Sequence, residues 1–319
     1  MKSISLRIIL ALFATLIATF IGFESFAAPA NSCADLFIDC DKSTLPLPTL
    51  GALALEEPEV EAKLSVPDAK TFRKMRELVG QEITVTDPKG QNVVFHIEFN
   101  KEHIYKDTYF DIGDSEHLKL FSKGGLLRQR KRLDKEAGEK DFTPRYINFQ
   151  AKNNSSADAG MNTAVFARNE IRGKKTDKFK KFVDHRADRL AADSKDKAVK
   201  YARDIAQSSA KFKEVLFVEQ ERYFMKVTKK GKPDLAIPAF YVSLDKVGFE
   251  GLIGEKRTAK DRFVEIEIID DLTNDAVNDS TTKLYLLNKL TENLQKRYGL
   301  TPAADDKYVT GVKLTVLKQ

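Results

Sequence analysis

Acidic and basic side chains alternate with apolar ones in a short segment of the chain. Glu59, Glu61 and Lys63 occupy every second position, and Val60 and Ala62 fill the gaps between them. Side chains two residues apart in a β-strand point to the same face, so two carboxylates and one ammonium group are expected to share a face. Such a face is most often solvated in a half-exposed sheet. The alternative is that these charges face a binding site for a charged ligand.

The same alternation recurs in five further predicted strands. Their charged positions are Arg128 and Arg130, Lys152, Arg168 and Glu170, Arg222, and Glu265 and Glu267. If the strands close into a barrel, these charges line the lumen and helices cover the apolar outer faces. A charged lumen is unfavourable when empty and dry, because each buried ion costs on the order of several kcal/mol. It becomes favourable with a polyanion and cations inside, since arginine and lysine bind phosphoryl oxygens and paired carboxylates hold hard divalent metals.

The order of the predicted elements favours an α+β fold with a largely antiparallel sheet. Helices are expected at residues 68–79 and 282–298, where apolar residues repeat at helical spacing, and a charged, mainly helical insertion is expected at about 175–213. Besides the strand that starts near residue 59, strands are expected at 82–85, 92–99, 105–111, 125–132, 145–152, 164–172, 215–227, 240–247 and 263–269.

The N-terminus has the pattern of a secretory signal peptide. Lys2 and Arg7 precede an apolar run at residues 8–23, and small residues follow. We therefore expect residues 1–30 to be removed and the protein to be exported, either to the periplasm or by secretion. An uncleaved N-terminal membrane anchor is the alternative. The mature chain is expected to have no transmembrane segment, because no second apolar run is long enough to cross a bilayer.

The segment that follows has the composition of a linker. Residues 31–55 carry two prolines and many small residues, and they include Cys33 and Cys40, which are expected to form a disulfide in an oxidising compartment. The folded domain is predicted to occupy residues 56–319.

The charge balance favours an anionic partner without identifying it. The 53 basic and 47 acidic residues give a net charge of +6, which is a mild excess, and no nucleic-acid partner is expected. The four histidines are scattered, so no zinc-type ligand set is visible, and any metal is expected to be a hard ion held by oxygen atoms.

Taken in order, these segments resemble the motifs of the CYTH domain, also called the triphosphate tunnel metalloenzyme family, over roughly residues 56–311. Residues 59–63 resemble its ExExK signature, residues 107–111 its DTYFD motif, and residues 127–130 its LRxR motif. Later matches are Lys152, the RxE motif at 168–170, Arg222, the LDxV motif at 243–247, the ExE motif at 265–267, and Lys307-Tyr308. Two departures concern substrate preference more than fold: Asp306 stands where a serine usually lies, and Gln220-Glu221 replaces a typically basic approach to Arg222.

The resemblance implies an eight-stranded antiparallel tunnel, flanked by helices, that binds a triphosphate or polyphosphate together with Mg²⁺ or Mn²⁺. The phosphate-binding residues carried over by position are Lys63, Arg128, Arg130, Lys152, Arg168, Arg222 and Lys307. The metal ligands carried over are Glu59, Glu61, Glu170, Asp245, Glu265 and Glu267, and all of these except Asp245 are also expected to be catalytic. The metal would neutralise phosphoryl charge while the acids position a water for in-line attack. Arg168 has the alternative role of orienting Glu170 through a hydrogen bond.

The resulting hypothesis is an exported, metal-dependent triphosphatase that hydrolyses inorganic tripolyphosphate or a related linear triphosphate. One alternative is an adenylate cyclase of the CYTH type, against which export counts because ATP is scarce outside the cytoplasm. A second alternative is a protein that binds polyphosphate without hydrolysing it. Tyr109 and Tyr308 are expected to be packing residues, and no oligomeric state is predicted.

Overall fold

A computed structural model of the chain describes residues 58–136, 138–153, 165–230, 240–268, 280–303 and 305–317. The predicted signal peptide, the linker and the Cys33–Cys40 disulfide lie outside the described residues. Every described residue belongs to one compact unit, which comprises residues 46–319.

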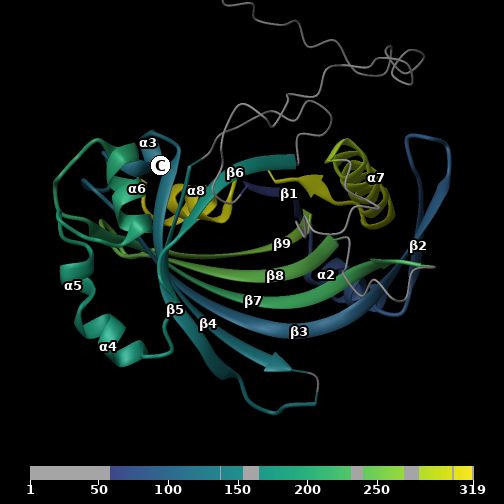
Figure 1. The fold of residues 1–319 in the computed structure, drawn as a ribbon, viewed down its shortest axis with the longest axis horizontal. Helices are drawn as coiled ribbons and strands as arrows, with labels where there is room; N and C mark the ends of the chain where they lie inside the picture. The colour runs from purple at the N-terminus through teal and green to yellow at the C-terminus, as the bar shows by residue number, and fades with distance from the viewer. Residues whose placement is uncertain are drawn as a thin grey trace, which may run out of the picture. The chain divides into compact units, whose positions relative to one another are not determined.

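The fold is built on one ten-stranded sheet in which neighbouring strands run antiparallel (Figure 1). The strands are β1 (Pro58–Ser65), β2 (Glu82–Thr86), β3 (Asn92–Asp111), β4 (Gly125–Glu136), β5 (Thr143–Asn153), β6 (Val165–Arg172), β7 (Lys213–Lys229), β8 (Phe240–Gly251), β9 (Thr258–Ile268) and β10 (Thr301–Pro302). Their order is β10-β1-β6-β5-β4-β3-β7-β8-β9, with β2 paired to β3. An additional pairing joins β1 to β9, so β1 pairs with β6 through residues 58–62 and with β9 through residues 61–65. The predicted α+β class with a largely antiparallel sheet is confirmed.

Helices pack against this sheet at several places. They are α2 (Ala69–Met75), η3 (Arg76–Leu78), α3 (Lys119–Ser122), α4 (Phe179–Asp184), α5 (Arg186–Arg189), α6 (Lys197–Ala206), α7 (Ser280–Tyr298) and α8 (Lys307–Thr315). The two helices expected at residues 68–79 and 282–298 are present as α2 with η3 and as α7. Figure 1 shows α4, α5 and α6 at the end of the sheet away from α7. The short α8 was not predicted, and its first two residues are the Lys307-Tyr308 pair.

The structure corrects one strand assignment. The two strands predicted at 92–99 and 105–111 form the single strand β3, which runs through the polar residues between them. Its pairing with β7 shifts register between Phe99 and Lys101, as in a β-bulge, so one extra residue is absorbed without ending the strand. The polar residues between the two predicted strands therefore belong to one long strand that contains a bulge.

Both faces of β1 are buried. Ala62 and Leu64 are fully buried in an apolar cluster that also contains Leu290 of α7 and Phe72 of α2. On the opposite face, Glu61 and Lys63 are only 4% and 2% exposed. The interpretation of this charged face as solvated is therefore wrong.

An apolar cluster under α8 occupies one end of the strands. Tyr308 and Val312 of α8 pack in it with Leu126 of β4 and Phe249 of β8. Gly311 allows this close approach, because an added Cβ atom would lie 2.7 Å from a carbon of Phe249. The contact brings Lys307 and Tyr308 next to charged residues of the sheet.

No helix in the described part of the chain has both the length and the apolar character needed to cross a membrane.

Candidate functional site

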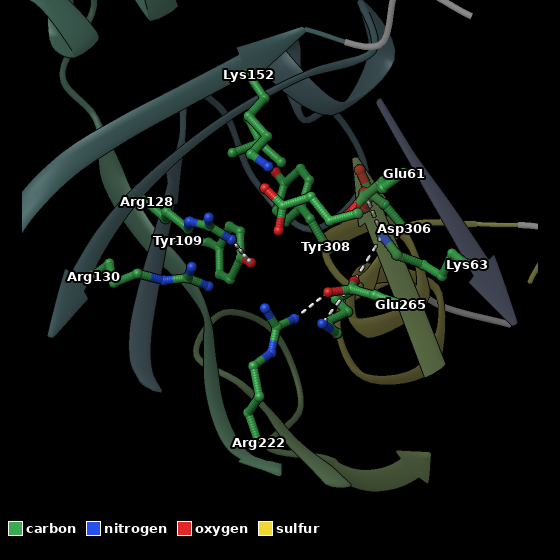
Figure 2. A pocket seen from close by; sticks show the side chains of 13 residues that line it. Glu61, Lys63, Tyr109, Arg128, Arg130, Lys152, Arg222, Glu265, Asp306 and Tyr308 are labelled. Atoms are coloured by element: carbon green, nitrogen blue, oxygen red, sulfur yellow. Dashed lines mark hydrogen bonds and ion pairs between the residues drawn. The ribbon is translucent and has the colours of Figure 1, made fainter. Parts of the chain in front are cut away.

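Charged side chains from several strands and from α8 surround one cavity (Figure 2). The cavity has an empty volume of about 450 Å³, which includes its opening to solvent. It is lined by Glu61, Lys63, Tyr109, Leu126, Arg128, Arg130, Lys152, Arg222, Glu265, Glu267, Asp306, Lys307 and Tyr308. Six of these are lysine or arginine and four are carboxylates, so the lining has a formal charge of +2.

The sequence predicted thirteen site residues, and nine of them line this cavity: Glu61, Lys63, Arg128, Arg130, Lys152, Arg222, Glu265, Glu267 and Lys307. The side chains of Glu59 and Arg168 lie outside the described residues. Glu170 and Asp245 are not in the lining, but both are buried directly behind it and contact lining residues. The metal-binding and catalytic roles assigned to these residues stay predictions.

Glu265 is held by three cations. Its carboxylate lies 3.2 Å from Lys63 Nζ, accepts a hydrogen bond of 2.8 Å from Lys307 Nζ, and pairs with Arg222. Lys63 also donates to Glu61 at 3.1 Å. Burial alone would raise the pKa of Glu265, but Lys307, Lys63 and Arg222 hold this pKa well below its ordinary value. Glu265 is therefore an anion at any pH near neutrality.

Asp245 supports the same group from behind. Its carboxylate accepts two hydrogen bonds of 2.7 Å from the Arg222 guanidinium and one of 2.6 Å from Lys307 Nζ. Burial lowers the pKa of Lys307, and Arg222 and Lys63 lower it further, while Asp245 and Glu265 oppose the change. The two acids thus keep a buried lysine charged next to the cavity.

Arg128 and Arg130 are fixed by side chains of the neighbouring strands. Asp107 of β3 accepts from Arg130 at 2.9 and 2.6 Å, in a two-pronged pair, and lies 3.5 Å from Arg128. Gln150 of β5 accepts two hydrogen bonds from Arg128, at 2.9 and 2.7 Å. Burial would raise the pKa of Asp107, but Arg130 and Arg128 lower it overall. The guanidinium groups are consequently aimed at the cavity, as Figure 2 shows.

Glu170 of β6 is a buried acid behind the cavity lining. It pairs with Arg172 at 2.6 Å and lies 3.8 Å from both Lys152 and Arg128. Burial acts to raise its pKa, but Lys152, Arg172 and Arg128 lower the pKa below its ordinary value. In this structure the carboxylate therefore orients cations.

Two tyrosines form the floor of the cavity. The rings of Tyr109 and Tyr308 stack with their centroids 4.9 Å apart, and the Tyr308 hydroxyl donates to Asp111 at 2.8 Å. Burial raises the pKa of Tyr308 well above its usual range, and the adjacent Asp111 raises it further. Both rings pack, as expected, and they also line the site.

Sequence reasoning missed four contributors. Asp107 entered the sequence prediction only as the first residue of a motif, and no role was predicted for Gln150, although it lies two residues before Lys152 on β5 and therefore shares its face. Asp306 was noted only as a departure from the motif that concerns substrate preference, and nothing in the sequence pointed to Leu126. Asp306 accepts from the Val309 amide and begins α8, which the sequence pattern did not predict.

The carboxylates offer the right donor atoms for a hard divalent cation. Mg²⁺ and Mn²⁺ prefer carboxylate oxygens, and Glu61, Glu265 and Glu267 reach the cavity from adjacent strands. Glu61 and Glu267 are direct cross-strand partners, an arrangement of like charges that a cation would relieve. Within the described residues, no three His, Cys, Asp or Glu side chains are gathered closely enough to hold a metal ion. The donors fit such an ion in type, while the structure pairs Glu61 with Lys63 and Glu265 with three basic side chains.

Comparisons with known proteins identify no family. No protein-family model matches the chain, and no curated protein matches it. Among solved structures, the PH1819 protein from Pyrococcus horikoshii OT3 is similar over 79% of this chain and 98% of its own, with 19% sequence identity and a TM-score of 0.40.

Proposed function

We propose that the chain is an exported, metal-dependent triphosphatase of the CYTH type, which hydrolyses inorganic tripolyphosphate or a related linear triphosphate. The observation that carries the proposal is the cavity lined by six lysine and arginine side chains together with four carboxylates. Export rests on the N-terminal sequence pattern alone.

The strand pairings support a tunnel. Beginning at β1, the pairs run through β6, β5, β4, β3, β7, β8 and β9, and β9 pairs with β1 again. Such a circuit is what an eight-stranded closed barrel requires. In such a barrel the charged faces of these strands would enclose the cavity, and α2 and α7, which pack on apolar residues of the sheet, would cover outer faces.

The cations suit a linear triphosphate. Arg128 and Arg130 present guanidinium groups that are held from behind, and Arg222 faces them from another strand (Figure 2). Planar guanidinium groups match phosphoryl oxygens in a two-pronged manner, and Lys307 adds a point charge. A ligand that carries several closely spaced negative charges can contact all of them, whereas a single carboxylate could not.

The acids supply the remaining chemistry. When bound, Mg²⁺ or Mn²⁺ would neutralise charge that develops on the transferred phosphoryl group. The oxygens that would hold the ion are those of Glu61, Glu265 and Glu267. Because Glu265 stays ionised at neutral pH, it can accept a hydrogen bond from a water and orient it for attack on the terminal phosphorus.

Phosphate release tests the proposal. The purified full-length chain, incubated with tripolyphosphate and Mg²⁺ or Mn²⁺, should release orthophosphate. Glu265→Gln should lower the rate by about 10²–10³-fold, as loss of one preorganised charged group in an active site does. Glu219→Gln is the control, because Glu219 pairs with Lys106 at 2.8 Å outside the cavity and is 45% exposed. The proposal fails if no orthophosphate appears from tripolyphosphate, other short polyphosphates or nucleotides.

One observation favours a second candidate, a protein that binds polyphosphate without cleaving it. The described residues hold no preformed cluster of three metal-binding side chains, and Glu265 is occupied by three cations. Calorimetry with tripolyphosphate would show tight binding in both cases. Binding without release of orthophosphate or pyrophosphate in the presence of added metal would identify the binding protein.

A further inference from the structure

We propose a second anion-binding subsite at the rim of the sheet, formed by Arg132, Arg145 and Lys175 and here called the rim cluster. It binds the distal phosphates of an inorganic polyphosphate longer than tripolyphosphate, whose terminal phosphates occupy the main cavity. This inference rests on the proposed function and extends its substrate class.

The rim cluster belongs to a separate open pocket of about 750 Å³, including its opening to solvent. The pocket is lined by Arg132, Asp134, Arg145, Tyr146, Lys175, Thr176 and Asp177. These residues come from β4, from β5 and from the segment after β6, where Thr176 forms an isolated bridge with Ile147. That bridge places Lys175 and Asp177 beside the strand that carries Arg145 and Tyr146.

One buried carboxylate positions both arginines. Asp134, whose side chain is 4% exposed, accepts from Arg132 Nε at 2.6 Å and lies 3.3 Å from Arg145 Nε. His103, which is buried, fixes the same carboxylate through a contact of 2.7 Å between its Nδ1 and Asp134. The two arginine side chains remain 24% and 49% exposed. Asp134 holds one edge of each guanidinium group, and each arginine side chain is still partly exposed to solvent, as a site for a soluble anion requires.

Tyr146 contacts Lys175, the third cation of the rim cluster. Lys175 Nζ lies 5.0 Å from the centre of the Tyr146 ring, and Arg132 Cζ lies 5.7 Å from it. Both distances are in the range of cation–π contacts. The ring surface that could stack a nucleobase carries cations instead, so the pocket favours further phosphates over a nucleoside.

A line of arginines joins the main cavity to the rim cluster. Arg128, Arg130 and Arg132 lie two residues apart along β4, so they share a face at steps of about 7 Å. Arg130 Cζ and Arg132 Cζ both lie near the ring of Tyr105, at 4.0 and 5.9 Å from its centre. Guanidinium groups, two of them held by Asp107 and Asp134, therefore continue from one pocket to the other.

The same strand gives the direction in which a long ligand extends. Leu126, two residues before Arg128, belongs to the apolar cluster under α8. A polyanion cannot continue into that cluster without losing its hydration. Along β4, a chain longer than the main cavity therefore extends past Arg130 toward Arg132.

Binding measurements test this inference. Calorimetry on the full-length chain compares tripolyphosphate with long-chain inorganic polyphosphate, without added metal so that turnover does not interfere. The test variant is Arg145→Gln with Lys175→Gln. The charge-matched control is Lys246→Gln with Lys256→Gln, because these exposed lysines pair with Glu221 and Glu250 away from both pockets.

The rim variant should bind the long chain about tenfold more weakly than wild type, a change of about 1.4 kcal/mol. Its affinity for tripolyphosphate should match wild type, and the control should bind both probes normally. Its affinity for the long chain should also depend less steeply on salt, because two cations no longer contact phosphate.

Three results would overturn the inference. The rim variant could bind the long chain as tightly as wild type does, or it could lose affinity equally for both probes. In either case hydrolysis of tripolyphosphate by wild type would leave the proposed function intact. If wild type neither binds nor hydrolyses either probe, the proposed function and the rim cluster fall together.

Discussion

His103 provides a sharp test of the buried polar network. Its ring is 2% exposed, contacts Asp134 through Nδ1 at 2.7 Å, and has the Arg132 guanidinium 3.4 Å from Nε2. Burial lowers the pKa of His103 from 6.5 to about 4, because desolvation disfavours the charged ring more strongly than the hydrogen bond to Asp134 favours it. The folded protein therefore keeps this histidine neutral.

The direction of the pH effect follows from proton uptake. The unfolded chain protonates His103 near pH 6.5 and the folded chain only near pH 4, so between these values the unfolded state binds more protons. The stabilisation is fully present above pH 6.5 and is lost as the pH falls toward 4. Between pH 7 and pH 5 the two pKa values correspond to a loss of about 2 kcal/mol in the free energy of unfolding.

Urea denaturation at pH 7 and pH 5 measures this loss. We expect the free energy of unfolding of wild type to fall by about 2 kcal/mol from pH 7 to pH 5. The variant His103→Asn, which keeps a hydrogen-bond donor for Asp134, should lose much less. His96→Asn on the same strand is the control, since that ring is 37% exposed. Carboxyl groups contribute little to the change in the free energy of unfolding between these two pH values, because their pKa values in the unfolded chain lie near 4. Equal slopes for wild type and His103→Asn would refute the reasoning.

Two further substitutions test the packing of α8. Lys307→Met removes one charged hydrogen-bond donor from each of two buried carboxylates, Asp245 and Glu265, and should lower the free energy of unfolding by about 1.5–3 kcal/mol. Lys313→Met, on the same helix but 53% exposed, should change it by less than about 0.5 kcal/mol. Similar values for both variants in urea denaturation would contradict the assigned ion pairs. Gly311→Ala would place a Cβ atom 2.7 Å from carbons of Leu216 and Phe249. The free energy of unfolding should therefore fall by about 1–3 kcal/mol, which thermal unfolding measures. An unchanged melting temperature would show that α8 packs less closely against the sheet than described.

Alternation of charged and apolar residues predicted much of the sheet, because it reports which residues share a face. It placed Glu61 with Lys63, and Arg128 with Arg130, in lining positions of one cavity. Which residues of a strand share a face is a local property, fixed by strand geometry, and it does not depend on the partner strands. The strand positions could therefore be predicted from the sequence, whereas the pairing of the strands could not.

The features that could not be predicted from the sequence depend on contacts between distant segments. Nothing within β3 shows that its polar middle pairs with β7, because the bulge after Phe99 is defined by the partner strand. Lys307 looked like the end of a motif, yet its helix forms on an apolar cluster supplied by other strands. Asp107 and Asp245 are buried for the same reason: the arginines that neutralise them, Arg130 and Arg222, come from neighbouring strands.

The ion pairs of the main cavity bear on what a ligand must bring. Glu265 is balanced by Lys63, Lys307 and Arg222, so an anion that recruits these cations leaves a buried carboxylate under-compensated. Such a charge is costly unless another cation takes the vacated place. Under the proposed function, a triphosphate and a divalent metal ion therefore stabilise each other's binding, and this coupling is reciprocal. Under the same proposal, a bound triphosphate would free carboxylate oxygens that are now tied to basic side chains, and these oxygens would then hold the metal ion.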